Sequence, residues 1–488
     1  MSPSSEPAID PRLIQLLPAQ SAREFLALPL RKEGQVIVLA MREGHDLETE
    51  ADLAFVLGAP VRVEPWEKDA LREAIDEVYG AEPEPSALIT ANGTEEEKES
   101  AFFLPNASSG SAVSVVNDLV SRAIKAGASD IHIEPYEKFL RVRYRLDGVL
   151  HEVQRLSPLE AKAVISRVKI MADLDIAEKR RPQDGRIRVK EGDRFIDIRV
   201  SSLPTDFGEK LVLRILDKNQ LNLDLEKLGF EAPDLKLFQR TLKLPYGMLL
   251  VTGPTGSGKT TTLYAALNAI NRQEVNITTI EDPIEYNLPG INQTHVRSDI
   301  GVTFAAALRS ILRQDPNVIM VGEIRDGETA EIAIRAALTG HLVLSTLHTN
   351  DAPSAITRLT DMGIEPFLVA ASVKMILAQR LLRRICPECK TVADATSEQR
   401  EEIALKSSRG FVNGIGCPSC NGTGYRGRTA VYEMLPIQNG LSDMISRGVT
   451  LGEMRAKAEA NGLTTLRQAG LKKALACETS LKEVLRET

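Results

Sequence analysis

Hydrophobic and polar positions repeat in two ways along the chain, and the changes between them divide it into segments. In residues 1–90, LIQLLPAQSAREFLALPL has the spacing of an amphipathic helix, and DALREAIDEVYG predicts a second helix. Between them, GQVIVLAM and LAFVLGAPVRVEPW are apolar runs that favour strands. These patterns predict a small amino-terminal α/β domain.

Residues 91–111 contain many acidic, small and turn-forming residues, which predicts a flexible linker. Residues 112–222 then open on AVSVVNDLVSRAIKAG, an amphipathic helix that ends at Gly127. The alternating strands that follow flank a second helix, expected around residues 159–172. We therefore expect an α+β domain. Its arginines lie on the polar sheet face, where most are expected to be solvated.

In residues 223–488 the apolar runs change character. The runs GMLLVT, NITTIEDPIEY, NVIMVGEIRD and HLVLSTLHTND lack alternation, as strands of a parallel sheet do when both faces are buried. Polar residues end three of these runs, and an open α/β sheet binds its ligands at the carboxyl ends of its strands. The side chains expected to converge there are Glu281, Asp282, Glu285, Glu323 and His348.

The octet GPTGSGKT stands between the strand GMLLVT and a helix predicted over residues 260–270. A glycine-rich turn between a strand and a helix aims backbone N–H groups at phosphates, and the helix dipole favours the anion. Lys259 is expected to reach the β- and γ-phosphates of ATP, and the Thr260 hydroxyl to bind Mg²⁺. The predicted nucleotide-binding residues are Gly253, Pro254, Thr255, Gly256, Ser257, Gly258, Lys259, Thr260 and Thr261.

ATP hydrolysis also needs a polarised water and positive charge near the γ-phosphate. Glu323 closes an apolar strand and is the candidate to polarise that water. Many P-loop ATPases carry an aspartate just before this glutamate, but here Gly322 stands there, so the acid for Mg²⁺ should come from the EDPIEY segment. His348 is expected to sense the γ-phosphate. For Glu285, pairing with a surface arginine is an equally weighted alternative.

Four of the five cysteines form two C-x-x-C pairs within residues 380–430. Four thiolates complete the tetrahedral shell of a structural Zn²⁺ site, and this spacing favours a metal over disulfides in a reducing compartment. The predicted zinc ligands are Cys386, Cys389, Cys417 and Cys420.

The net charge and the apolar runs of the whole chain argue against further classes of function. It has 488 residues and a net charge of −7, whereas nucleic-acid binders are usually basic. No apolar run reaches the roughly 18–20 residues that span a bilayer, and the amino terminus does not resemble a signal peptide. We therefore expect a cytoplasmic protein that does not bind nucleic acid.

Five stretches give the sequence its resemblance to the secretion ATPases of the type II and type IV pilus superfamily, from residue 112 to the end. They are ASDIHIEP, RPQDGRI, GPTGSGKT, TIEDPIEY and the pair VGEIRD with TGHLVLSTLHTND. The paired CPEC and CPSC segments are similar to those of the assembly and export branch of the family.

This resemblance implies a RecA-like ATPase domain preceded by an α+β, PAS-like domain. It also implies a homo-hexamer with ATP at the subunit interface, where Arg199 and Arg214 serve as arginine fingers. Glu281, Asp282 and Glu285 match the Asp box of the family and His348 its His box. The Gly322 that departs from other P-loop ATPases is usual in this family.

The partners implied are an inner-membrane anchor protein for the amino-terminal domain and a polytopic platform protein. The protein would attach peripherally to the cytoplasmic face of the inner membrane. We expect an ATPase of type II secretion, because pilus assembly ATPases, the alternative, generally have longer amino-terminal regions. A DNA translocase is disfavoured by the acidic charge. The cluster Arg380, Arg383 and Arg384 is expected to face anionic lipid or the platform.

Overall fold

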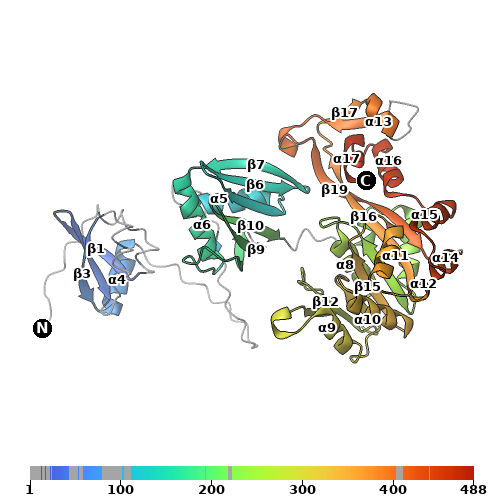
Figure 1. Cartoon of the computed structure of the whole chain (residues 1–488). Coiled ribbons are helices and arrows are strands. Elements are labelled where there is room, and N and C mark those ends of the chain that lie inside the picture. Colours follow the sequence, from blue (N-terminus) through green and yellow to red (C-terminus); the bar gives the residue numbers. More distant parts are fainter. Residues whose placement is uncertain are drawn as a thin grey trace. The chain divides into compact units, whose positions relative to one another are not determined.

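The computed structural model divides the chain into two compact units, residues 1–97 and 98–488 (Figure 1). It describes residues 25–42, 59–79, 102–103, 112–192, 194–217, 223–402, 410–438 and 440–488, and the single positions Leu13, Leu17, Ala22 and Leu53. The expected boundary at residue 222 and most of the expected linker therefore lie outside the described residues.

In its described residues, the first unit contains a three-stranded sheet and helix α4 (Lys68–Tyr79). Strand β2 (Val36–Arg42) lies between β1 (Ala27–Glu33), which is antiparallel to it, and β3 (Val61–Trp66), which is parallel. Helix α4 packs on them through Leu71 and Ile75. The helical prediction for LIQLLPAQSAREFLALPL is wrong at its end, where Ala27 begins a strand. The rest of that stretch lies largely outside the described residues.

The second unit opens with a seven-stranded sheet in the order β4-β8-β9-β10-β5-β6-β7. Its strands are β4 (Phe102–Phe103), β5 (Asp130–Pro135), β6 (Leu140–Leu146), β7 (Val149–Leu156), β8 (Gln183–Glu191), β9 (Arg194–Thr205) and β10 (Gly208–Leu216). Helices α5 (Ala112–Lys125) and α6 (Pro158–Met171) pack against it in one apolar core. The α+β prediction is confirmed. The linker prediction is wrong for Phe102 and Phe103, which pair with β8.

Downstream lies a second seven-stranded sheet, in the order β13-β12-β14-β15-β11-β16-β19. Its strands are β11 (Gly247–Thr252), β12 (Ile277–Glu281), β13 (Asn292–His295), β14 (Val318–Val321), β15 (Leu342–Leu347), β16 (Val373–Ile385) and β19 (Tyr425–Pro436). All neighbours are parallel except β16 and β19. The parallel sheet was predicted, whereas strands β16 and β19 were not.

Both faces of this sheet are covered, and β11 shows how. Met248 and Leu250 point into one apolar core, while Leu249 and Val251 point into the other, as the two-residue strand period requires. Helices α7 (Ala232–Thr241) and α8 (Lys259–Ile270) cover the second face. The first face is covered by α9 (Phe304–Ile311), α10 (Gly327–Leu338), α11 (Ala352–Asp361), α12 (Pro366–Ser372), α14 (Leu441–Ser446), α15 (Leu451–Ala460), α16 (Leu466–Leu475) and α17 (Leu481–Glu487).

The remaining short elements connect these layers. They are the 3-10 turns η2 (Leu225–Lys227), η3 (Ser298–Ile300) and η4 (Pro418–Cys420), the hairpin strands β17 (Lys390–Ala393) and β18 (Phe411–Gly414), and helix α13 (Ser397–Glu402). None of the helices in the described part of the chain is both long and apolar enough to cross a membrane.

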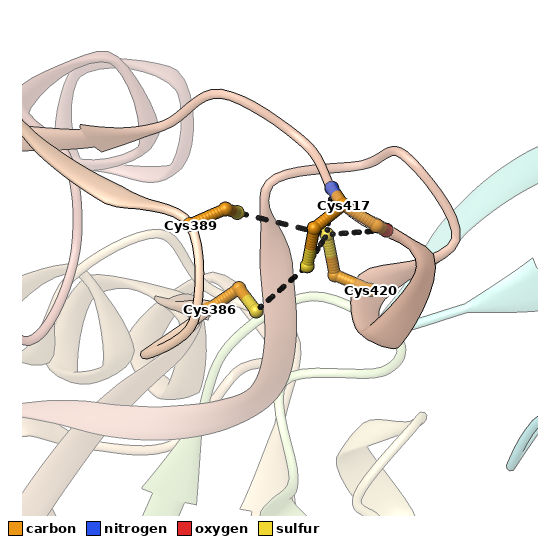
Figure 2. Close-up of side chains that lie close together, drawn as sticks. All are labelled: Cys386, Cys389, Cys417 and Cys420. Carbon is orange, nitrogen blue, oxygen red and sulfur yellow. Dashed lines mark hydrogen bonds between the residues drawn. The ribbon is translucent and has the colours of Figure 1, made fainter.

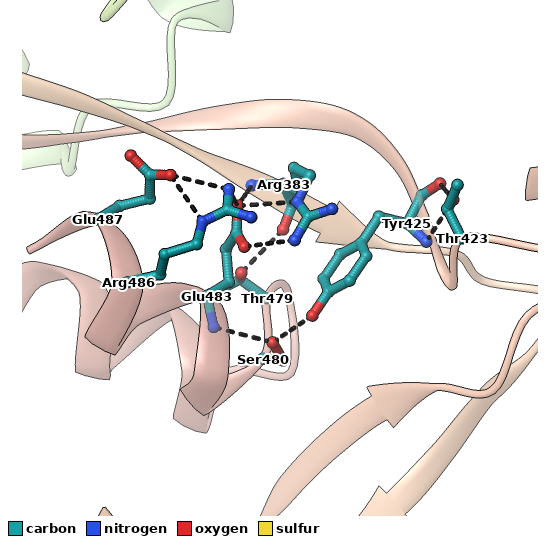
Figure 3. A network of polar contacts seen from close by, with 8 residues as sticks. All are labelled: Arg383, Thr423, Tyr425, Thr479, Ser480, Glu483, Arg486 and Glu487. Carbon is teal, nitrogen blue, oxygen red and sulfur yellow. Dashed lines mark hydrogen bonds and ion pairs between the residues drawn. The ribbon is translucent and has the colours of Figure 1, made fainter. Parts of the chain in front are cut away.

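The last helix is held to β16 by a polar network that we call the carboxyl-terminal clamp (Figure 3). Arg383 on β16 donates two hydrogen bonds to the Glu483 carboxylate, at 3.0 and 2.8 Å, and Glu483 is 1% exposed. Thr479 donates to the Arg383 carbonyl at 2.8 Å, and Arg486 donates to Glu483 at 2.8 Å. The remaining members shown are Thr423, Tyr425, Ser480 and Glu487.

The clamp corrects one sequence expectation. Arg383 is committed to Glu483, and Arg380 is buried and donates to the backbone carbonyls of Gln379 and Asn350. These two side chains therefore do not form a basic surface for lipid or a platform protein. Only Arg384, the third member of the cluster, is exposed.

Candidate nucleotide and metal sites

The phosphate loop leaves the buried strand β11 and enters helix α8 through residues with positive φ. Gly253 has φ 149° and Gly258, the N-cap of α8, has φ 89°. A Cβ at Gly253 would lie 2.6 Å from the Gln379 carbonyl oxygen, and one at Gly258 would lie 2.7 Å from the Gln379 amide nitrogen. The loop therefore needs glycine at these positions, both for its backbone conformation and for the close approach of β16.

The side chains of the loop are arranged as an anion cradle. Lys259 Nζ donates to the carbonyls of Gly253 and Pro254, at 2.9 and 3.1 Å, so it lies folded over the loop. The Ser257 hydroxyl is buried without a hydrogen-bond partner in the described structure. Burial and the nearby Arg380 lower the pKa of Lys259, against the opposing effect of Glu323. A phosphate would satisfy Ser257 and offset this crowded positive charge.

Glu323 and His348 lie together next to the loop. Glu323 follows β14 and accepts from His348 Nε2, which follows β15, at 3.3 Å. Glu323 also accepts a hydrogen bond from Arg325, whose Nη2 lies 3.4 Å from Asp282 Oδ2. We call Lys259, Asp282, Glu323, Arg325 and His348 the nucleotide cluster.

The three acids at the end of β12 and just after it point in different directions. Asp282 belongs to the nucleotide cluster through Arg325. Glu281 is 3% exposed and turns into the core, where Thr279, Tyr264 and Gln293 donate to it, which differs from the expected convergence on the nucleotide. The carboxylate of Glu285 pairs with an arginine, the alternative considered for it.

That arginine is Arg199, on β9 of the sheet that precedes the ATPase sheet. Arg199 donates to Glu285 Oε2 at 3.2 Å and to the Ile284 carbonyl at 2.6 Å. Arg214 on β10 is its cross-strand neighbour, but pairs with Asp130 at 3.1 Å and keeps 56% of its side chain exposed. The structure therefore brings Arg199, and not Arg214, to the Asp-box segment of the same chain.

A cavity of about 540 Å³ opens beside the phosphate loop. The Phe230 and Tyr432 rings lie in its wall, stacked with centroids 3.8 Å apart, and the Tyr432 hydroxyl donates to the Leu228 carbonyl at 3.0 Å. Gly258 and Thr261 border the same cavity, so a nucleotide with its phosphates on the loop could place its base there.

Sequence reasoning missed Arg325, Phe230 and Tyr432. Arg325 had a usable signal, because it lies two residues after Glu323 on the loop at the carboxyl end of β14. The two aromatic residues are about two hundred positions apart in sequence and belong to elements whose pairing is visible only in the fold. Nothing in their local sequence sets them apart from ordinary core aromatics.

The four paired cysteines form a separate centre between β16 and β19 (Figure 2). Their sulfur atoms all lie within 4.8 Å of one another, with Cys386–Cys417 and Cys389–Cys420 each at 3.8 Å. Four thiolates at about 2.3 Å from a tetrahedral zinc are about 3.8 Å apart, so this geometry fits Zn²⁺. Burial raises the pKa of Cys420, but the backbone N–H groups of Cys417 and Gly424 outweigh it and lower the pKa to about 6.

The arrangement at the nucleotide edge can hydrolyse a phosphoanhydride. Lys259 and the loop N–H groups would hold phosphates, and the exposed Thr260 hydroxyl with a nearby acid could hold Mg²⁺, which neutralises phosphate charge. The Glu323 carboxylate can accept a proton from, or orient, the attacking water. His348, beside it, can donate to a phosphate oxygen.

Together the fold and this site define a P-loop ATPase with a RecA-like, doubly wound sheet. Residues 106–486 match the family model described as Type II/IV secretion system protein, and the chain belongs to that family of ATPases. Residues 4–85 match a second model, the MshEN domain.

Curated relatives come from both branches of the family. The type IV pilus assembly ATPase PilB of Myxococcus xanthus is 48% identical over 497 residues, covering 98% of this chain and 87% of that protein. The type II secretion system protein E of Aeromonas hydrophila is 43% identical over 490 residues, covering 98% and 97%. The type II secretion system ATPase E of Vibrio cholerae is 52% identical over 379 residues, covering 77% and 75%.

Solved structures agree on the fold. The crystal structure of the pilus retraction motor PilT with bound ADP matches with a TM-score of 0.51 and 26% identity, covering 76% of this chain and 95% of that chain. The ATPase DotB of Legionella pneumophila matches with a TM-score of 0.58 and 19% identity, covering 80% and 99%.

Proposed function

We propose that this chain is a hexameric ATPase that powers protein export through a type II secretion system at the cytoplasmic face of the inner membrane. The observation that carries the proposal is the pair of hydrogen bonds from Arg199 to the Asp-box segment. Through them, a segment that begins at the nucleotide cluster reaches the preceding domain. A change of nucleotide state can therefore move that domain, as a motor requires.

Assembly into a hexamer gives Arg214 a role. Its side chain is 56% exposed, and it shares its partner Asp130 with Arg145. In the proposed hexamer, Arg214 leaves Asp130 and reaches the γ-phosphate bound by a neighbouring copy. An arginine finger supplied in this way raises the rate by about 10³–10⁵-fold.

Export also needs an anchor, and we assign this role to the amino-terminal unit. That unit is compact by itself, which suits a domain that holds the motor to an inner-membrane partner. A polytopic platform protein would receive the mechanical motion that ATP hydrolysis drives. No nucleic-acid partner is proposed.

The anchor assignment is tested by a chain that starts at Ala112. It should bind ATP like the full chain but no longer fractionate with membranes, and the isolated amino-terminal unit should compete with the full chain for membranes. Full-length K259A, which keeps the amino-terminal unit, is the matched control and should still fractionate with them. A shortened chain that still reaches the membrane through the same partner would remove the anchoring role.

Pilus assembly is the second candidate, and one comparison favours it. The Myxococcus xanthus pilus assembly ATPase matches 98% of this chain at 48% identity, so its amino-terminal part is covered too. Affinity capture from native membranes decides between the two, because the anchor that comes with the full chain belongs to one machine or the other. Capture of pilus assembly components would replace the export proposal.

We further propose that the four paired cysteines bind one zinc ion per chain. The test is metal analysis of protein purified without chelator, on wild type, C386S and C477S. Cys477 is the matched control, because it is the one cysteine outside the cluster. Zinc should be lost in C386S alone, with the phosphate loop still folded and binding nucleotide. Wild-type protein without zinc would refute the site.

A further inference from the structure

The hydroxyl of Tyr264 connects the phosphate-loop helix to the Asp-box segment. Tyr264 lies on α8, five residues after Lys259, and its side chain is fully buried. The hydroxyl donates to the Glu281 carboxylate and accepts from the backbone N–H of Glu285, at 3.3 Å. A single rigid side chain thus holds both ends of the turn that carries Asp282.

Protein donors fill three of the roughly four acceptor sites of the Glu281 carboxylate. Besides Tyr264, it accepts from Thr279 Oγ1 at 2.6 Å and from Gln293 Nε2 at 3.0 Å. Gln293 also accepts from the Leu288 N–H at 2.7 Å. A buried carboxylate is tolerated when such donors surround it, but little capacity is left for Mg²⁺.

The same turn is held from outside by two arginines. Arg325 of the nucleotide cluster contacts Asp282, and Arg199 of the preceding domain contacts Glu285 and the Ile284 carbonyl. The position of the turn relative to α8 therefore sets where both arginines find their partners. Tyr264 is the contact that connects this turn directly to the helix of the phosphate loop.

We propose that Tyr264 and Glu281 are a positioning pair for ATP hydrolysis. They fix the turn 282–285 on α8, so that Asp282 faces the nucleotide cluster and Glu285 faces Arg199. Glu281 is then a support of the turn and not a ligand of Mg²⁺. A shift of α8 on nucleotide binding passes through this pair to Arg199.

The test is a double-mutant cycle in kcat with Y264F, E281Q and the double variant. Y264F removes only the hydroxyl, and a small misplacement of a catalytic turn can reduce the rate by up to about 10²-fold. We expect each single variant to lower kcat, with KM for ATP little changed. The double variant should be no slower than the slower single variant, since both break one connection.

Two controls separate positioning from lost stability. Y144F removes another buried tyrosine hydroxyl, which donates to the Leu119 carbonyl at 2.6 Å in the preceding domain, and should keep wild-type kcat. T279V removes a different donor to Glu281 and leaves the bridge to Glu285, so it should keep a higher kcat than Y264F. The positioning role is refuted if the kcat of Y264F equals that of Y144F, or if the kcat of T279V is as low as that of Y264F.

The Mg²⁺ dependence of nucleotide binding shows whether Glu281 supports the turn or binds the metal. In E281Q the Mg²⁺ concentration that gives half-maximal binding of a fluorescent ATP analogue should equal that of wild type, whereas in D282N it should rise. A rise in E281Q as large as that in D282N would make Glu281 a ligand and overturn the proposal. Additive losses of kcat in the double variant would do so too.

Discussion

The nucleotide cluster and the carboxyl-terminal clamp both contain an Arg–Glu ion pair, but in opposite environments. In the nucleotide cluster the side chains of Glu323 and His348 are 20% and 51% exposed. In the clamp, Arg383 and Glu483 are 14% and 1% exposed. The first arrangement leaves charges open for exchange with a ligand, while the second satisfies them permanently. Exposure, rather than residue type, therefore separates a site that reacts from one that holds the fold.

The largest effect should come from breaking the nucleotide cluster. K259A removes the charge that faces the phosphates and should abolish both ATP binding and hydrolysis. E323Q keeps the shape but loses the carboxylate that polarises water, so it should bind ATP and lower kcat by about 10²–10⁴-fold. Both should melt like wild type without nucleotide. Steady-state ATPase assays and equilibrium nucleotide binding check this, and normal hydrolysis by E323Q would move the base to the Asp box.

The clamp should show the reverse behaviour, a loss of stability without a defect in chemistry. R383L leaves Glu483 buried without its main partner, which costs about 3–5 kcal/mol when a buried pair is broken. R486L removes the other arginine of Glu483, but this one is 42% exposed, so its cost should stay below about 1 kcal/mol. Denaturant midpoints of the ATPase unit measure the difference. Equal shifts in both variants would contradict the contrast.

A smaller effect is expected at Glu134 of β5, a buried carboxylate whose partners Arg143 and Lys210 are partly exposed. Burial would raise the pKa of Glu134, but hydrogen bonds from Arg143 and Lys210 hold it at about 2, against 4.5 unperturbed. Because the folded-state pKa is depressed, the stabilisation is present above pH 4.5 and is lost as the pH falls toward 2. In E134Q the free energy of unfolding should therefore fall less steeply between pH 4.5 and pH 2 than in wild type. Activity at neutral pH should be unchanged. The same pH dependence of the unfolding free energy in E134Q and wild type would contradict the pairing.

Features that depend on local patterns could be predicted from the sequence, whereas features that depend on distant partners could not. The phosphate loop, the parallel strands and the cysteine pairs are local patterns, and the structure confirms the sheet and the cysteine cluster. Strand β16 was missed because Arg380 and Arg383 interrupt its apolar run. Their partners Asn350 and Glu483 lie far away in sequence. Glu281 looked like an exposed acid at a strand end for the same reason, since Tyr264 and Gln293 satisfy it only after folding.

In the proposed hexamer, each ATP site is completed by a neighbouring copy. Mixing R214A with K259A tests this, because each variant should be inactive alone. In a mixed hexamer, the intact Arg214 of a K259A chain would serve the intact phosphate loop of an R214A chain, so activity should return in part. Mixing R199A with K259A is the matched control, since Arg199 contacts Glu285 of its own chain, and this mixture should stay inactive. Mixed assembly is confirmed by native mass spectrometry. Absence of rescue in confirmed mixed hexamers would contradict the shared site.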